Sequence, residues 1–314
     1  MLNVFNDAGR RKLYKLLRQL RDVPVTAKLT LDFSHLSEIK ISAILVLYAH
    51  LEVLLQSRPQ ARTFWSKPLD QDIDQKLAEL GVWALLGEEY QTVQGAIQIC
   101  SISYEQKQTD QKQPLRDAVT YAKEAIASYK VVGFKDDSDD GAFAEISESF
   151  TYVWQHAYAE DLQRSHCTLG ESPVLKKWWI ALSHFDNQLF MAVYDIGVGI
   201  PYSTRLKPWY TRLHQDIASK FGGKNADCHD IQTALAYGSS RYCEQGRGNG
   251  LPAIKNFVET NPNGEFYIMS GKGIYNCHSK GKTEEWSALD IDYPGTLIQW
   301  NLALGDGRTN SNEK

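Results

Sequence analysis

The chain has 314 residues, of which 43% are hydrophobic and 23% are charged. These fractions are typical of globular proteins, so the composition excludes a mainly disordered chain, and the length predicts about two domains. The formal net charge is −4. A balance this mild does not favour a dedicated nucleic-acid binder, because such proteins usually carry a basic excess.

The sequence also bears on location. The longest apolar run near the N-terminus, residues 44–47, is far shorter than the roughly 20 residues of a membrane span, and the first residues do not have the charge order of a secretory signal. The five cysteines include no CxxC pair, which favours reduced thiols and a cytoplasmic protein. Zinc ligands usually pair at short spacing, so Cys228-His229 and Cys277-His278 are weak metal candidates.

Strand and helix patterns alternate in the first hundred residues. Asn6-Asp7 can cap a helix that runs to about Arg21, since its leucines recur at helical spacing. The sequence then predicts a strand, an apolar helix, a short strand and a helix that ends at Gly81, over residues 25–33, 41–55, 61–65 and 70–80. This alternation predicts a small α/β layer. The basic face of the first helix, with Arg11, Lys15 and Arg18, is either solvated or a surface for a partner or a nucleic acid.

Residues 23–100 resemble the STAS domain of anti-sigma-factor antagonists. The shared feature is the strand LTLDFS, which continues through HLSEIKIS into an apolar helix. In regulatory members a serine in this turn is phosphorylated, but the matching position here is Ile41. The resemblance therefore implies the scaffold of a STAS-like domain over residues 1–103, without the phosphorylation switch.

The second half follows a polar linker, residues 104–114, and precedes a polar tail, residues 305–314. Helices are expected at residues 115–129 and from about Phe143. A hairpin of strands at 175–185 and 188–195 turns at Asp186-Asn187. Further helices at 209–221, 230–237 and 252–259 and strands at 265–270 and 295–302 complete the prediction. Trp178 and Trp179, on the strand predicted at residues 175–185, are expected in the core.

Two glycine-rich loops interrupt this pattern. Glycines let backbone amides approach a ligand closely, and a helix N-terminus offers unpaired N–H groups to an anion. GRGNGL at 246–251 opens a helix and adds the cation of Arg247, which suits phosphate oxygens. DIGVGIP at 195–201 follows an apolar strand. It places the Asp195 carboxylate beside a bare backbone, where it can accept a hydrogen bond from the amine of a planar ligand.

In this order the two loops resemble those of the GHKL ATPase superfamily, over residues 115–304. The resemblance implies a Bergerat-type α/β sandwich with a mixed sheet, and ATP as the ligand. It implies that Asp195 binds the adenine amine, that a later Gly-Thr element includes Thr296, and that the second loop with its upstream serines contacts the phosphates. The implied ATP-binding residues are Tyr152, His156, Asp195, Gly197, Gly199, Ile200, Ser239, Ser240, Gly246, Arg247, Gly248, Asn249, Gly250, Leu251 and Thr296.

The acidic helix matches the N box of this superfamily, Glu-x-x-x-Asn-x-x-x-His. Glu148, Tyr152 and His156 stand at its three positions and share one helix face. The resemblance implies that Glu148 is the catalytic base. The middle position should be an Asn that binds Mg²⁺, and a Tyr phenol is a poor ligand for a hard cation. The sequence therefore does not identify the metal ligands, and it leaves open whether Mg²⁺ is a cofactor. Glu145, one turn before Glu148, is a candidate carboxylate to replace the missing Asn.

These observations leave three functions. The first is an ATP-binding regulatory protein whose nucleotide state changes its contacts with a protein partner. The second is an active Mg²⁺-dependent ATPase or serine/threonine protein kinase with Glu148 as base. The third is a non-catalytic interaction protein with a vestigial pocket. We expect a protein partner or a homodimer, and neither a membrane nor a nucleic acid as partner.

Overall fold

The computed structural model describes residues 3–24, 27–57, 62–89, 97–103, 177–185, 187–221, 226–237 and 250–304, together with Thr120. Helix α1 (Asp7–Asp22) begins where the sequence predicts it. Asn6 Oδ1 accepts a hydrogen bond from the backbone N–H of Gly9 at 2.8 Å, which satisfies an amide that a first turn leaves unpaired. Leu13, Leu17 and Leu20 are buried on one face.

The predicted α/β layer of the first half is confirmed. Strands β1 (Leu29–Asp32) and β2 (Thr63–Ser66) form a parallel pair, with Leu29 opposite Thr63. Helix α2 (Ile41–Ser57) connects them, since parallel strands need a long crossover. Most of α2 is buried, as its apolar sequence predicts.

Two short helices follow β2. Asp70 caps α3 (Gln71–Glu79) and accepts a hydrogen bond from the N–H of Asp72 at 2.9 Å. The left-handed Gly81, with φ of 77°, ends this helix as predicted and precedes α4 (Val82–Leu85). The sequence analysis did not predict α4, which is a single turn.

A five-stranded sheet forms the centre of the molecule. Its strand order is β3-β4-β5-β7-β6, and every neighbouring pair among these described strands is antiparallel. The strands are β3 (Ile97–Ser103), β4 (Lys177–Phe185), β5 (Gln188–Asp195), β6 (Glu265–His278) and β7 (Thr283–Ala303). The mixed sheet predicted for this half is therefore wrong for the described residues. Tight hairpins join β4 to β5 and β6 to β7, and such hairpins produce antiparallel neighbours.

The sheet differs from the sequence prediction in two further respects. Strand β3 was not predicted, because its partner β4 lies far along the chain. It belongs to the residues assigned to the first domain, yet it pairs with a strand of the second half. Strands β6 and β7 run further than predicted, because their ladder continues beyond a register shift at Ser270 and Gly271.

The part of the second half that the structure describes contains the helices α7 (Ile200–Arg205), α8 (Tyr210–Phe221), α9 (Ala226–Tyr237) and α10 (Gly250–Thr260). The last three match predicted helices. The expected helices at 115–129 and from Phe143, the linker at 104–114 and the tail at 305–314 lie outside the described residues, apart from Thr120.

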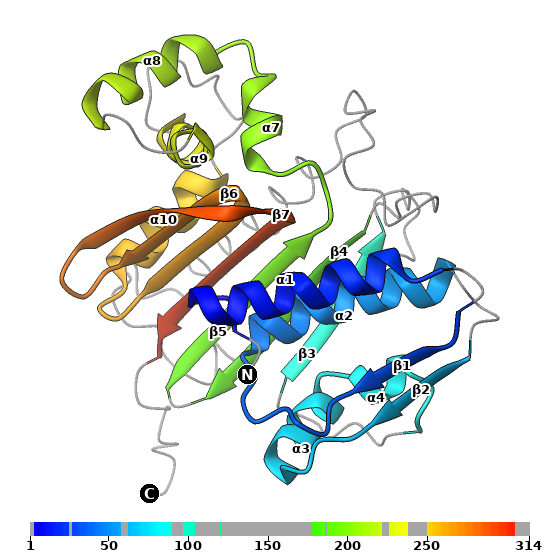
Figure 1. The fold of residues 1–314 in the computed structure, drawn as a ribbon. Helices are drawn as coiled ribbons and strands as arrows, with labels where there is room; N and C mark the ends of the chain where they lie inside the picture. Colours follow the sequence, from blue (N-terminus) through cyan, green and yellow to red (C-terminus); the bar gives the residue numbers. More distant parts are fainter. Residues whose placement is uncertain are drawn as a thin grey trace, which may run out of the picture.

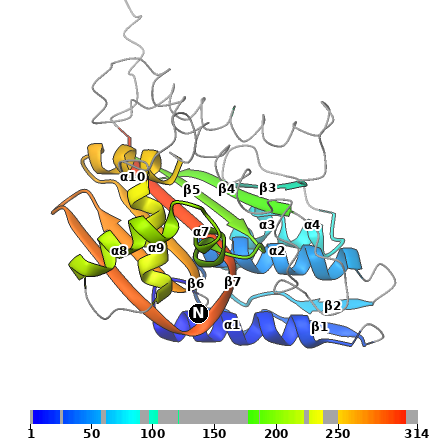
Figure 2. The ribbon, with the colours of Figure 1, turned by 90° about the horizontal axis from the view of Figure 1, so that it is seen from above.

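The sheet separates two helical layers. Alternate side chains point to opposite faces of a strand, so Trp179 and Tyr194 pack toward α1 and α2, and Trp178 and Val193 pack toward α9 and α10. Figures 1 and 2 show α1 and α2 side by side on one side of the sheet. Both tryptophans are fully buried, which confirms their assignment to the core.

The described residues thus form a mixed α/β fold with one parallel and one antiparallel sheet. One apolar cluster includes residues of α1, α2, α3 and β1 together with residues of β4, β5 and β7. The first half and the central sheet therefore share a core. Within the described ranges, no helix has both the length and the apolar character needed to cross a membrane.

Candidate functional site

Polar residues form a row across three neighbouring strands at one end of the sheet. Asp195, the last residue of β5, pairs with Thr296 on β7, and Thr296 pairs with Ser270 on β6. All three are buried. Their neighbours along the strands, Tyr194, Met269 and Leu297, pack toward α1 and α2. The three polar residues therefore lie on the opposite face of the sheet, which packs against α9 and α10. Asp195 and Thr296 are far apart in the sequence, and the sequence analysis predicted both as site residues. It did not predict Ser270, the third residue of the row.

The Asp195 carboxyl is the ionisable group of this row. It is 3% exposed, and within the described part of the chain it accepts one hydrogen bond, from the N–H of Gly197 to Oδ1 at 2.7 Å. Burial raises the pKa of Asp195 to about 7, and the Gly197 bond opposes this rise. Near neutral pH the carboxyl therefore changes easily between its charged and neutral forms.

The loop after β5 needs a glycine at position 199. Gly199 has a φ of 83°, and a Cβ atom there would lie 2.9 Å from Ser270 Oγ. The next amide, of Ile200, donates to the same oxygen at 2.9 Å. Ser270 thus fixes the start of α7 against β6. A small polar residue inside the apolar strand EFYIMSG is the signal that could have identified it.

Thr296 and its neighbour complete the row. Ser270 Oγ donates to the carbonyl of Gly295 at 3.1 Å, so Thr296 Oγ1, at 3.1 Å from Ser270 Oγ, must be the donor in the other contact. Gly295 has a φ of 74°, and a Cβ atom there would lie 1.8 Å from the Asp195 carbonyl oxygen. The predicted Gly-Thr element therefore lies directly against Asp195.

The structure accounts for part of the predicted site. It brings together Asp195, Gly197, Gly199, Ile200 and Thr296 at the end of β5. Gly250 begins α10, and Leu251 is buried in the core beneath that helix. The remaining predicted residues lie outside the described residues: Glu148, Tyr152, His156, Ser239, Ser240, Gly246, Arg247, Gly248 and Asn249.

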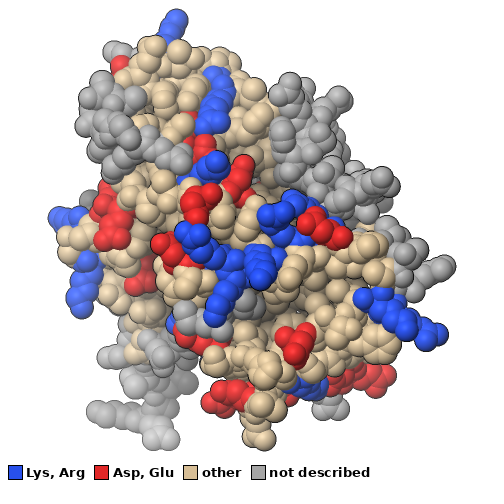
Figure 3. All heavy atoms as spheres, in the orientation of Figure 1, with Lys and Arg blue, Asp and Glu red and all other residues tan. Residues whose placement is uncertain are grey.

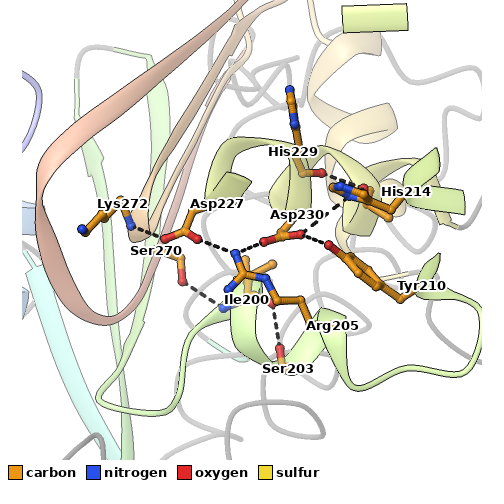
Figure 4. A network of polar contacts seen from close by, with 11 residues as sticks. Ile200, Ser203, Arg205, Tyr210, His214, Asp227, His229, Asp230, Ser270 and Lys272 are labelled. Carbon is orange, nitrogen blue, oxygen red and sulfur yellow. Dashed lines mark hydrogen bonds and ion pairs between the residues drawn. The ribbon is translucent and has the colours of Figure 1, made fainter. Parts of the chain in front are cut away.

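An ionic network around the buried Asp230 holds the helices that follow the loop (Figure 4). Asp230 of α9 is fully buried and forms an ion pair with Arg205 of α7. The Tyr210 hydroxyl donates to Asp230 at 2.6 Å. Burial raises the pKa of Asp230, and the Tyr210 hydrogen bond and the Arg205 charge oppose that rise. Sequence analysis could not find this network, because its members come from separate elements.

The same arginine connects the network to the sheet. Arg205 donates to Asp227 Oδ1 at 2.7 Å, and Asp227 Oδ2 accepts a hydrogen bond from the backbone N–H of Lys272 on β6 at 2.8 Å.

The glycine loop itself is held at both ends. Asp195 accepts the hydrogen bond at its start, and Ser270 accepts the one at its end. This arrangement fixes the Gly197 amide against the Asp195 carboxyl.

The described residues contain no cluster of three or more His, Cys, Asp and Glu side chains that could hold a metal ion. Cys228 and Cys277 are buried free thiols, and Cys228 Sγ donates to the carbonyl of Ser287. No protein-family model matches this chain, and no curated protein matches it.

Proposed function

We propose that this chain is an ATP-binding regulatory protein, in which a GHKL-type pocket holds the nucleotide and couples it to a protein partner. One observation carries the proposal. The buried Asp195 carboxyl lies beside the Gly197 amide and opposite Thr296, at the end of a strand and the start of a glycine loop. Those positions are the ones that the GHKL resemblance implies for adenine recognition.

The chemistry of these groups suits adenine. An adenine ring has an exocyclic amine, which needs a hydrogen-bond acceptor, and a flat face, which needs a wall without bulky side chains. Asp195 Oδ2 offers the acceptor, and Gly197 has no side chain that would obstruct a flat ring. A charge-assisted hydrogen bond in a buried site contributes about 1.5–3 kcal/mol. The phosphate contacts of Gly246–Leu251 remain a prediction from the sequence.

The proposal extends to the rest of the chain as a STAS-like domain before a Bergerat-type domain. The packing of α1 and α2 on the sheet supports coupling between them, because α2 contacts β4, β5 and β7. A change at the end of β5 can thus reach the first half through one shared core. The expected partner is a protein, or a second copy of this chain.

Titration calorimetry with ATP tests this function. We expect wild type to bind ATP at roughly micromolar strength, and Asp195→Ala to weaken binding about tenfold to a hundredfold. Inosine triphosphate, which has a carbonyl in place of the amine, should bind wild type weakly. Asp290→Ala is the matched control, since Asp290 is exposed and forms a surface ion pair with Arg11. Failure of wild type to bind ATP, with Mg²⁺ or with EDTA, would overturn the proposal.

The same samples distinguish a binder from a catalyst. A regulatory binder should turn over ATP negligibly, and Tyr152→Asn should introduce Mg²⁺-dependent turnover by restoring the Asn of the N box. If wild type already hydrolyses ATP or phosphorylates a serine or threonine, Glu148→Gln should remove turnover while binding persists. That result would favour the enzyme over the regulatory protein.

A further inference from the structure

A stripe of cations runs along the outer face of α1. Arg11, Lys15 and Arg18 follow one another at spacings of four and three residues, so they lie on one side of the helix over about 10 Å. All of them are exposed, on the side away from the buried leucines. Figure 3, in the orientation of Figure 1, shows Lys and Arg side chains gathered over this helix. These three residues are called the basic stripe below.

The chemistry of the helix itself explains little of this stripe. Like charges three and four residues apart on a helix repel one another, so the stripe lowers the stability of α1. The helix dipole favours cations in the last turn, which accounts for Arg21 but not for Lys15 in the middle of the helix. Within the described chain, Arg11 forms an ion pair with Asp290 at 2.6 Å, whereas Lys15 and Arg18 form none. An anionic partner would remove the repulsion that remains.

Carboxylates at both ends of the stripe limit the size of such a partner. The exposed Asp22 follows one turn after Arg18, and Asp290 lies beside Arg11. A long polyanion such as DNA would meet these carboxylates. The chain also has a net charge of −4, which disfavours the long-range attraction of a nucleic acid or an anionic membrane. The basic stripe therefore fits a short acidic segment of a protein.

A cavity of about 420 Å³ adjoins the stripe at Arg18. Helix α1 and the glycine loop both line it, with Tyr14, Leu17 and Arg18 from the helix and Ile196, Gly197 and Val198 from the loop. Of the other charged residues at the cavity, Arg205 is paired with Asp227, and Arg21 and Asp292 are exposed. The aromatic and aliphatic walls suit a large apolar side chain, which is the usual anchor of a protein interface.

We propose that the basic stripe and this cavity form the docking surface for the protein partner, and that the partner presents a short acidic segment with one aromatic or aliphatic side chain. Carboxylates of the segment pair with Lys15 and Arg18, and its apolar side chain enters the cavity. The regulatory role of this contact rests on the proposed function, because an occupied cavity touches the loop that follows Asp195. Partner binding and ATP binding then alter each other's affinity by the same factor.

A labelled peptide of Glu and Asp residues with one central Phe tests the surface on the full chain without nucleotide. We expect fluorescence anisotropy to show binding that weakens as the salt concentration rises. Replacement of the Phe by Ala should weaken binding about tenfold, because the cavity then loses its anchor. A peptide in which Lys replaces every acidic residue should not bind. Absence of binding by the acidic peptide, or equal binding of the Phe and Ala peptides, would overturn the proposal.

Charge reversal tests whether the peptide binds at α1. The double variant Lys15→Glu with Arg18→Glu should bind the acidic peptide at least about tenfold more weakly, and it should bind the Lys peptide, which wild type does not. Lys76→Glu with Lys280→Glu is the matched control. It changes the net charge equally, at exposed positions outside α1 that do not line the cavity. Circular dichroism checks that both variants keep their helices. Equal weakening in both variants would contradict the docking surface.

Other occupants of the surface give different results. Duplex DNA and vesicles that contain phosphatidylserine are titrated at the same salt concentration as the peptide. Tighter binding of either probe than of the acidic peptide, lost in the charge-reversed variant, would overturn the assignment to a protein partner. A dimer of the free chain that the charge-reversed variant dissociates would assign the surface to a second copy, and would likewise overturn it.

Peptide titration with saturating ATP separates this inference from the ATP proposal. We expect ATP to change the affinity for the peptide about fivefold, and Asp195→Ala to remove that change without altering peptide binding in the absence of nucleotide. A change that persists in Asp195→Ala would mean that ATP competes for the stripe, and would overturn the coupling. If wild type does not bind ATP, the proposed function fails, and the peptide titration without nucleotide still decides the docking surface.

Discussion

Individual residues at the end of β5 show how burial changes chemistry. Asp195 is surrounded by the sheet and the following loop, and within the described residues it is compensated by one backbone hydrogen bond. Removal of a carboxylate from water favours its neutral form. Its pKa of about 7 therefore reflects a cost that the folded protein bears at neutral pH, and such costs are common at functional sites.

This cost predicts a dependence of stability on pH. The folded pKa of about 7 exceeds the unfolded value of 3.8, so the folded state binds more protons between these values, and stability falls as the pH rises through that window. Asp195→Asn is neutral at every pH, and its amide oxygen can still accept the Gly197 N–H. We expect the variant to be the more stable protein above pH 7, by at most about 4 kcal/mol.

Denaturant unfolding of ligand-free wild type and Asp195→Asn at pH 5 to 8 checks this expectation. The difference between the two free energies of unfolding should increase from pH 5 to pH 7 and then level off. A difference that does not change with pH would mean that Asp195 keeps an ordinary pKa. Because wild type and Asp195→Asn are compared at the same pH, the contributions of all other titrating groups to stability cancel.

At the scale of elements, the approach of β7 to β5 depends on Gly295. This glycine lets the segment before Thr296 pass over the carbonyl of Asp195 in a left-handed conformation. Thr296 then reaches Ser270, and Ser270 holds the first amide of α7. One backbone position thereby aligns two strands and a helix around the candidate site.

Gly295→Ala should therefore be strongly destabilising. Its Cβ atom would meet the Asp195 carbonyl oxygen at 1.8 Å, and relief of this overlap requires a backbone shift. We expect a loss of about 3 kcal/mol or more in the free energy of unfolding. Gly87→Ala is the matched control, because Gly87 also has a positive φ, of 95°, but a Cβ atom there meets nothing within 4 Å. Equal losses in both variants would contradict the steric argument.

At the scale of the whole molecule, a buried ionic contact joins the first half to the central sheet. Glu52 of α2 accepts hydrogen bonds from Lys177 Nζ at 2.8 Å and from the Trp179 indole N–H at 2.5 Å, both on β4. All three side chains are largely buried. Removal of one member of such a cluster is costly, because it leaves buried polar groups uncompensated.

Glu52→Ala should thus lower the free energy of unfolding by about 3 kcal/mol. Glu38→Ala is the control, since Glu38 is exposed and its ion pair with Lys40 spans 3.9 Å. Because the two halves share a core, fluorescence and circular dichroism should report one coincident transition for wild type. Two separate transitions would show that the halves unfold independently.

The sequence by itself determined most local structure in the described residues. The Asn6 cap, the stop at Gly81 and the hairpin at Asn187 all come from short-range chemistry between neighbouring residues. The loop DIGVGIP likewise indicated, from its own residues, that Asp195, Gly197 and Gly199 belong together. These features depend on few residues at close spacing, so pattern analysis can find them.

Tertiary structure decided the features that depend on residues far apart along the chain. Strand β3 forms because β4 pairs with it. The antiparallel order of the sheet was not predicted, because hydrogen bonding between distant strands leaves no local pattern in the sequence. Ser270 became part of the site only when β6 came to lie beside β7. Such contacts depend on pairing and packing between distant segments, which no local pattern encodes.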